Sequence, residues 1–178
     1  MRPDARRTPL GGSPAQFPRK KNQAKSFAEF GGVIDRRTAD SFPINAGRTQ
    51  RHHDLAKVEL LGDEARVLVS IFVSQPVTLP LELSFLERHP QGSQAFMPLH
   101  EERFLVVVAP PGDTISPDEV RAFVTDGFQG VNYRAGTWHA VQSVLDREGE
   151  FLVIDRGGSG NNCDEYGMEV RVLLDLSD

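Results

Sequence analysis

The densest group of side chains that could do chemistry lies at Glu87, Arg88 and His89, followed closely by Gln94. The apolar residues before this group predict a strand, and side chains two apart in a strand point to the same face. Glu87 and His89 are therefore expected to project together while Arg88 points away. Residues 90–93, Pro-Gln-Gly-Ser, are typical of a turn, which would bring Gln94 back beside them.

A second imidazole follows a glycine turn at Gly136-Thr137-Trp138-His139. Two imidazole nitrogens, from His89 and His139, and two oxygens, from Glu87 and Gln94, are a mixed ligand set that suits a divalent ion of borderline character. The sequence therefore predicts a metal site, with nickel as the first choice and zinc or manganese next. Two alternatives stay open: a hydrogen-bonded buried pair of Glu87 and His89, and an acid/base site that needs no metal.

Short strands are expected to position these groups. Runs of Val, Ile, Leu and Phe separated by turn residues predict strands over 56–61, 66–73, 81–88, 104–109, 121–125, 130–133, 151–155 and 170–174. Phe27 and Phe30 share one face of a predicted helical turn that ends at Gly31-Gly32 and covers the core. Ser116 and Pro117 mark another short helix start. Many short strands and few helices favour an all-β fold, an antiparallel sandwich or barrel.

Length and composition limit the kind of protein. The chain has 178 residues, which suits one domain, and we expect a flexible basic tail over 1–25 and a single domain over 26–178. A net charge of −5 gives no reason to expect nucleic acid as a partner, and no apolar run is long enough to span a membrane. The lone cysteine, Cys163, excludes an internal disulfide and favours the cytoplasm.

The two groups around His89 and His139 resemble the two cupin motifs. Those motifs supply His-x-His with a Glu three or four residues on, and later a His two residues beyond Pro-x-Gly. Here the first reads Glu87-x-His89-x4-Gln94 and the second Arg134-x-Gly136-x2-His139, so two of the four usual ligand types are changed. The resemblance implies a cupin-type antiparallel β-barrel or jelly roll.

Whole phrases of the chain resemble the ureidoglycolate lyases, in order along most of its length. The matching phrases are Arg51-His52-His53-Asp54-Leu55-Ala56, Leu86-Glu87-Arg88-His89-Pro90, Gly92-Ser93-Gln94-Ala95-Phe96, Arg121-Ala122-Phe123, Gly130-Val131-Asn132-Tyr133, Trp138-His139 and Ile154-Asp155-Arg156-Gly157-Gly158-Ser159. The chain departs from the family at position 52, where His replaces the usual aromatic residue. The resemblance implies a carbon–nitrogen lyase that splits ureidoglycolate into glyoxylate and urea in allantoin and purine breakdown, and it implies a homodimer.

That reaction needs a carboxylate clamp, a base and an acid. Arg51 and Arg156 are the candidates for the clamp, although each could equally form a surface ion pair. His53, oriented by Asp54, is the first choice for proton transfer, with Glu87, His89 and His139 as the other catalytic candidates and metal ligands.

Asn132 and Tyr133 are the expected partners of the ureido group, although Tyr133 could instead pack in the core. Three other functions stay open. They are an amidohydrolase that releases ammonia, a non-catalytic cupin that binds a small acid, and a metal-dependent oxygenase.

Overall fold

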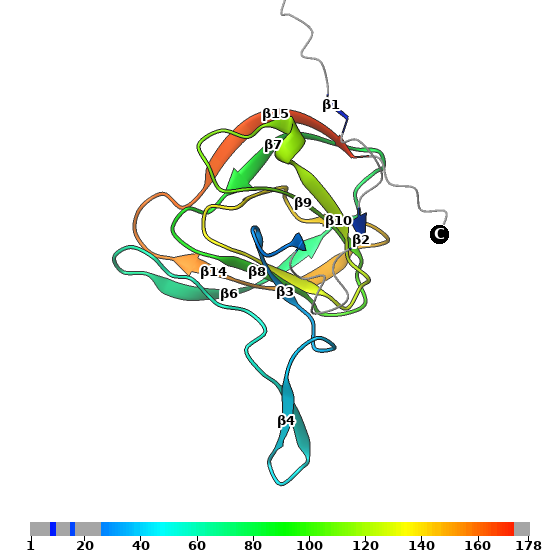
Figure 1. Cartoon of the computed structure of the whole chain (residues 1–178), viewed down its shortest axis with the longest axis vertical. Coiled ribbons are helices and arrows are strands. Elements are labelled where there is room, and N and C mark those ends of the chain that lie inside the picture. Colours follow the sequence, from blue (N-terminus) through cyan, green and yellow to red (C-terminus); the bar gives the residue numbers. More distant parts are fainter. Residues whose placement is uncertain (1–7, 10–14, 17–25, 173–178) are drawn as a thin grey trace, which may run out of the picture.

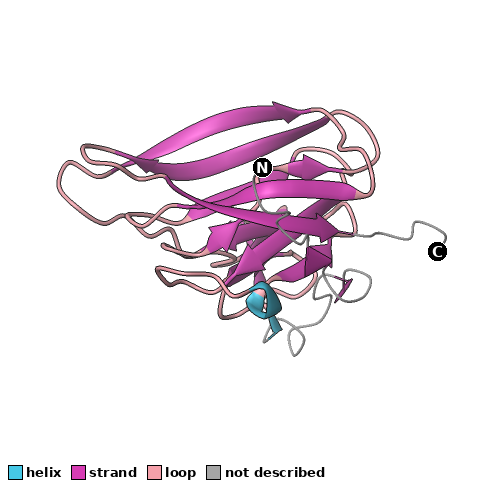
Figure 2. Cartoon of the chain, turned by 90° about the horizontal axis from the view of Figure 1, so that it is seen from above, coloured by secondary structure: helices cyan, strands magenta, loops and turns pink. Residues whose placement is uncertain are grey.

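Two facing β-sheets make up most of the computed structural model, which describes residues 8–9, 15–16 and 26–172. Figures 1 and 2 show the two layers, with a short helical turn at one edge. The larger sheet has the order β1-β15-β7-β12-β9-β10-β2, with β13 paired to β9. Its strands are β1 (Thr8–Pro9), β2 (Ala15–Gln16), β7 (Leu81–Arg88), β9 (Phe104–Ala109), β10 (Arg121–Val124), β12 (Trp138–His139), β13 (Ser143–Val144) and β15 (Asp164–Val172).

The smaller sheet has the order β3-β11-β8-β14-β6. Its strands are β3 (Gly31–Ile34), β6 (Arg66–Ser74), β8 (Gln94–Pro98), β11 (Gly130–Tyr133) and β14 (Gly149–Gly157). A separate hairpin, β4 (Ser41–Ile44) with β5 (Thr49–His52), projects from the side of the body on which β3 and β6 lie (Figure 1). The all-β architecture expected from the sequence, with mainly antiparallel sheets, is confirmed.

The core between the sheets is built by strand alternation. On β9, Phe104, Val106 and Val108 face the smaller sheet and join one apolar cluster, while the residues between them join a second cluster on the opposite face. β9 is therefore buried on both sides, which explains why it reads as a continuous apolar run. From the smaller sheet, Phe96 and Val153 pack into the first cluster.

Two crossings between the sheets lie side by side. The turn after β7 leads into β8 of the other sheet, and the turn after β11 leads back into β12. The second turn uses Gly136 at φ +81°, in the left-handed region that favours glycine, and the Gly136 N–H donates to the carbonyl of His89 at 2.9 Å. The two chain segments with the candidate chemistry are thus fastened together.

Several elements differ from expectation. Residues 56–61 are not a strand, and only Leu60 makes an isolated bridge, to Gly92. Residues 26–30 do form the expected helical turn, in which the Phe27 carbonyl accepts the Phe30 and Gly31 N–H groups at 3.0 and 3.1 Å; the turn leads directly into β3, and Phe27 and Phe30 are fully buried as predicted. The hairpin β4–β5 and strand β8 were not predicted. Pro117–Glu119 does form the expected helical turn, as the 3₁₀ turn η2.

The predicted tail over 1–25 lies outside the described residues except for β1 and β2, which pair in parallel with β15 and β10. Among the described residues no helix has the length and apolar character needed to cross a membrane.

Candidate functional site

Three potential metal ligands meet inside the barrel. Glu87 is the next-to-last residue of β7, His89 directly follows this strand, and His139 lies opposite Glu87 on β12; one ligand atom from each lies within 4.8 Å of the others. His139 pairs also with Val108, whose side chain faces the core, so this row of the larger sheet points inward. The structure therefore brings together Glu87, His89 and His139, as their spacing predicted.

Arg88 points away from this cluster. Its guanidinium lies 4.6 Å from the centre of the Trp138 ring and donates to the Asp164 carboxylate at 2.9 Å, on the opposite face of the sheet. Arg88 is therefore held in place outside the barrel and leaves the inward face to its neighbours.

Backbone carbonyls set the tautomer of both histidines. The Nδ1 atom of His89 lies 2.6 Å from the carbonyl of Asn162, and the Nδ1 atom of His139 lies 3.1 Å from the carbonyl of Ala140. A carbonyl only accepts, so each Nδ1 carries the proton and each Nε2 has a free lone pair. Both Nε2 atoms are buried and have no hydrogen-bond partner among the described residues, which is the arrangement that a divalent cation would complete.

Burial controls the protonation of the cluster. Desolvation is the main cause of a raised pKa at Glu87, with the charge of Glu165 adding to it and that of His89 opposing it. Desolvation, helped by His89, lowers the pKa of His139 to about 3. His139 is therefore neutral at physiological pH and able to donate its lone pair, while Glu87 holds a proton more readily than an ordinary carboxyl.

Tyr133 fixes the plane of the His139 ring. Their ring centroids are 4.3 Å apart with an interplanar angle of 6°, and the His89 ring lies 5.3 Å from His139. Tyr133 is 4% exposed and belongs to the core cluster, and burial raises the pKa of its phenol, so the hydroxyl stays protonated. The structure therefore favours a role for Tyr133 in core packing and in positioning the His139 ring.

The smaller sheet presents a row of polar side chains to the cluster. Tyr133 pairs with Gln94 across one ladder. Across the next ladder Ile154 pairs with Ala95, and this register, continued by one residue, sets Asp155 opposite Gln94 on the same inward face. The Oε1 atom of Gln94 and the Oδ1 atom of Asp155 are both buried, and within the described part of the chain neither has a hydrogen-bond partner.

Comparisons with known proteins identify the family of this chain. A sequence model of the family described as Ureidoglycolate lyase matches residues 18–175. The chain belongs to the ureidoglycolate lyase family. It is 55% identical over 141 residues to the ureidoglycolate lyase of Chelativorans sp. (strain BNC1), covering 79% of this chain and 85% of that protein. It is 51% identical to the enzyme of the same name from Azotobacter vinelandii, covering 84% and 91%.

A solved structure of a dTDP-6-deoxy-D-glucose-3,5-epimerase from Legionella pneumophila is similar with a TM-score of 0.42 and 14% identity, covering 76% of this chain and 71% of that one.

In this ureidoglycolate lyase family member, two expected substrate-binding residues lie on the outer face of the smaller sheet. Asn132 alternates with the inward Tyr133, and its Nδ2 donates to the carbonyl of Lys57 at 2.9 Å. The guanidinium of Arg156 donates to the carbonyls of Leu61 at 2.7 Å and Ser159 at 3.1 Å, so it fastens two loops. The structure does not bring either side chain to the cluster.

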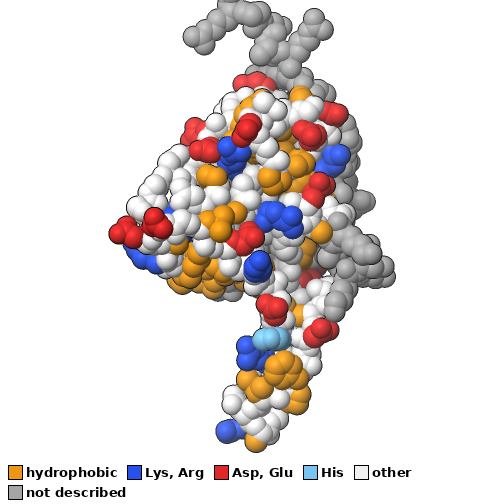
Figure 3. All heavy atoms as spheres, turned by 60° about the vertical axis from the view of Figure 1, so that its left-hand side comes forward, with side chains coloured by type: hydrophobic (Ala, Val, Ile, Leu, Met, Phe, Trp, Pro, Cys, Tyr) orange, Lys and Arg blue, Asp and Glu red, His pale blue; other side chains and the backbone are white. Residues whose placement is uncertain are grey.

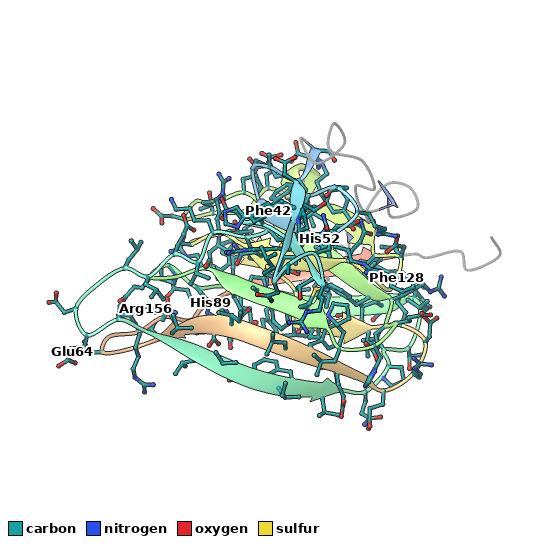
Figure 4. All side chains as sticks on the ribbon, turned by 90° about the horizontal axis from the view of Figure 1, so that it is seen from below. Phe42, His52, Glu64, His89, Phe128 and Arg156 are labelled. Atoms are coloured by element: carbon teal, nitrogen blue, oxygen red, sulfur yellow. The ribbon has the colours of Figure 1, made fainter. Side chains whose placement is uncertain are left out.

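Arg51 and His53 lie on or beside the hairpin, away from the cluster of their own chain. Arg51 stacks over Phe42 at 6.0 Å, and the His53 ring contacts Phe42 at 5.8 Å. Figure 4 shows Phe42 and His52 on this hairpin, whereas His89 and Arg156 lie towards one end of the barrel.

Sequence reasoning missed Asn162 and Asp155. Asn162 holds His89 through its carbonyl, and its side-chain Oδ1 accepts the Gln91 N–H at 2.7 Å, which fixes the loop before β15 against the turn after β7. Its place in the short polar stretch before β15 carries no hint that this loop touches a residue 73 positions earlier. For Asp155 a signal existed, because alternation from Val153 places it on the inward face.

Replacing Asn162 with Ala keeps the carbonyl that holds His89 but removes the Oδ1 atom that anchors this loop to Gln91, so divalent metal binding is expected to weaken, by at most the roughly tenfold to hundredfold that follows loss of an orienting partner. Titration of the metal-free protein with Ni²⁺ in a calorimeter measures the change. The nitrogen chemical shifts of His89 should show that its tautomer is no longer uniform. The matched control is Asn161→Ala, which removes the neighbouring side chain: Asn161 Nδ2 donates to Asp164 and Asn161 Oδ1 accepts the Cys163 N–H, and neither contact is with His89. Equal metal affinity in Asn162→Ala and the wild type would contradict this role.

Proposed function

We propose that this protein cleaves ureidoglycolate to glyoxylate and urea. One observation carries the proposal: a chain of the ureidoglycolate lyase family gathers Glu87, His89 and His139, with free and buried Nε2 atoms, inside its barrel. Relatives that are about half identical over most of both chains have the name of this activity.

The cleavage is an elimination at one carbon. The hydroxyl of ureidoglycolate loses its proton, its oxygen forms the carbonyl of glyoxylate, the carbon–nitrogen bond breaks, and the leaving nitrogen takes up a proton to become urea. Glu87 suits the proton transfers when no cation is bound, because burial raises its pKa closer to neutrality than that of an ordinary carboxyl; a cation ligated by this carboxylate would lower the pKa again. Glu87 accepts the hydroxyl proton as a carboxylate and returns a proton to the nitrogen. The neutral His139 accepts a hydrogen bond from the reacting hydroxyl at Nε2, or would ligate a cation there.

A divalent cation fits the three ligating side chains. Glu87 offers an oxygen, and His89 and His139 offer Nε2 atoms that nothing else among the described residues satisfies. When bound, such an ion lowers the pKa of a coordinated hydroxyl and stabilises the negative charge that develops on its oxygen. Nickel is our first choice for this mixed nitrogen and oxygen set, with zinc or manganese next.

The decisive experiment measures both products. Purified protein is incubated with ureidoglycolate, with and without chelator and with added Ni²⁺, and glyoxylate and urea are quantified. Equal amounts of both products support the lyase. Release of ammonia with glyoxylate would instead assign an amidohydrolase, and the absence of all products would refute the proposed function.

We propose also that the protein is a homodimer. The outer face of the smaller sheet exposes a row of apolar side chains on its edge strand β6: Val67, Val69, Ile71 and Val73. Val69 is 67% exposed. Figure 3 shows hydrophobic side chains along the lower part of the body and again on the hairpin. An exposed apolar face of this kind is typical of an interface, and a second copy offers the same face across a two-fold axis.

The hairpin suits a role across that interface. It projects from the same side as the apolar face. It carries Arg48 and Arg51, and no acidic residue lies between Ser41 and His53. As a separate two-stranded sheet it is only marginally stable alone, so contact with a second subunit would stabilise it. Its four-residue strands are about 13 Å long, so the hairpin is long enough to extend past a partner's sheet packed roughly 10 Å away.

The partner's barrel opening offers the opposite charge. Desolvation, followed by the charges of Glu87 and Glu165, raises the pKa of the Cys163 thiol, so two carboxylates lie near this thiol at the end of the barrel, whereas the nearby Asp164 is paired with Arg88. Within residues 26–172, the charged groups that shift the pKa of Glu87 are His89 and Glu165, so no guanidinium balances the site. The carboxylate of ureidoglycolate needs such a cation. We therefore assign Arg51 and His53 to the site of the partner subunit.

The single cysteine suits a cytoplasmic location, and that location is part of the proposal.

A further inference from the structure

The inward row on the smaller sheet has two acceptor atoms without donors. Gln94 Oε1 and Asp155 Oδ1 are both buried, and no described residue hydrogen-bonds to either atom. Leaving a buried acceptor unsatisfied is costly, so such atoms in a folded protein point to a missing donor. Two acceptors side by side on one row call for a ligand with more than one N–H group.

Asp155 occupies this row for reasons of strand pairing. Its neighbours at alternate positions, Phe151 and Val153, are fully buried in the core cluster, so the Asp155 side chain also points inward. Across the ladder, Asp155 pairs with Leu68 of β6 on one side, and continuation of the β8 register places Gln94 on the other.

Asp155 is not part of the metal-ligand cluster. The titratable groups whose ligand atoms lie within 4.8 Å of one another are Glu87, His89 and His139, and within the described part of the chain Asp155 does not join them. The barrel interior is thus divided: the larger sheet provides the nitrogens and the carboxylate of the cluster, and the smaller sheet provides amide and carboxylate acceptors.

We propose that Gln94 Oε1 and Asp155 Oδ1 together accept the N–H groups of a ureido ligand, the nitrogen end of the substrate. This inference rests on the proposed function and adds to it a subsite that recognises the leaving group. It assigns Gln94 to substrate binding instead of to the metal. A ureido group offers N–H donors on both nitrogens, which matches two neighbouring acceptors, whereas glyoxylate offers none.

The test uses Asp155→Asn, which keeps the shape but replaces one acceptor oxygen with an N–H₂ donor. In the full-length, metal-loaded protein, kcat/KM for ureidoglycolate should fall about tenfold to a hundredfold, the range expected when a buried hydrogen bond is lost. Urea binding, measured by calorimetry, should weaken by at least about tenfold. Binding of glyoxylate should be unchanged. The same amide can donate to Gln94 Oε1, so the melting temperature should rise by about 2–4 °C.

Two further variants complete the design. Glu150→Gln makes the same chemical change on the same strand, but Glu150 lies beside the exposed His100 outside the barrel, so urea binding should be unchanged. Gln94→Leu removes the other acceptor and should weaken urea binding in the same way, with Ni²⁺ affinity unchanged.

Loss of Ni²⁺ affinity in Asp155→Asn or Gln94→Leu would overturn the proposal by showing a metal ligand. Unchanged urea binding in Asp155→Asn would overturn it directly. Because urea binding requires no turnover, its loss in that variant supports the subsite even if the wild-type protein leaves ureidoglycolate intact, and only the proposed function would then fail.

Discussion

Replacing Glu87 with Gln should lower kcat for ureidoglycolate cleavage by about a thousandfold, because the change removes both the group that moves the proton and one ligand of the cation. Gln has nearly the same shape, so the barrel should fold normally. Glyoxylate and urea production measures the rate, and calorimetry with Ni²⁺ measures the accompanying loss of metal affinity.

The stability of the Glu87→Gln variant provides an independent readout. Burial raises the pKa of Glu87, so the folded state binds a proton more readily than the unfolded state does. The ionised carboxylate therefore destabilises the wild type, and this effect grows as the pH rises from the ordinary carboxyl pKa of 4.5 through the raised value. In chelator, the variant should be more stable than the wild type at pH 7 and nearly equal to it below about pH 4.

A matched control changes a carboxylate on the outer face of the body. Glu82→Gln on the same strand lies beside the exposed Arg171 and should keep both full activity and the wild-type pH dependence. Full activity in Glu87→Gln would contradict the assignment of the proton transfers to this residue.

A mixed dimer of Arg51→Ala and Glu87→Gln subunits should recover about half of the wild-type activity, although each variant alone is nearly inactive. If Arg51 acts in the site of the partner subunit, one of the two sites in this dimer loses both groups and the other keeps both. Co-expression with two different affinity tags isolates the mixed dimer for the product assay. Arg51→Ala alone should lose about a hundredfold in kcat/KM, because a charge-assisted contact to the substrate carboxylate is removed.

The control dimer combines two changes within the barrel cluster, Glu87→Gln with His139→Ala. Each of its sites contains one defect, so it should stay inactive. Inactivity of the Arg51→Ala with Glu87→Gln dimer would show that the hairpin serves its own chain. If sedimentation analysis found only a monomer, the proposed dimer interface would be refuted.

The local sequence pattern was enough to predict the part of the site that the larger sheet provides. Period-two alternation predicts that Glu87 and His89 share a face that excludes Arg88, and the turn chemistry at Gly136 predicts that the chain reverses before His139. These features depend on residues close together in sequence, whose relative positions are fixed by the short stretch of backbone that joins them.

The same reasoning failed at β11. All four of its residues are buried, so hydropathy gives no sign of which side chains face the barrel interior. Asn132 and Tyr133 were both expected at the substrate, but they point to opposite sides, and only the pairing of Tyr133 with Gln94 shows which one faces inward.

Residues 56–61 show a different limit. They contain apolar side chains in a strand-like pattern, yet this segment crosses the end of the smaller sheet and is held mainly by Glu59, whose carboxylate accepts the Ala135 N–H and whose carbonyl accepts the Ser93 N–H. Such contacts form only when the barrel closes, and they produce no periodic pattern of apolar residues in the sequence.

The sequence by itself determined the family, the all-β class and the Glu87, His89 and His139 cluster, because whole phrases, strand periodicity and turn residues are local properties. Only the tertiary structure decided that Asp155 lies beside Gln94, that the Asn162 carbonyl orients His89, and that Arg51 stands on a projecting hairpin. Those facts depend on register between strands distant in sequence, which is set by the packing of the whole barrel and not by any one segment.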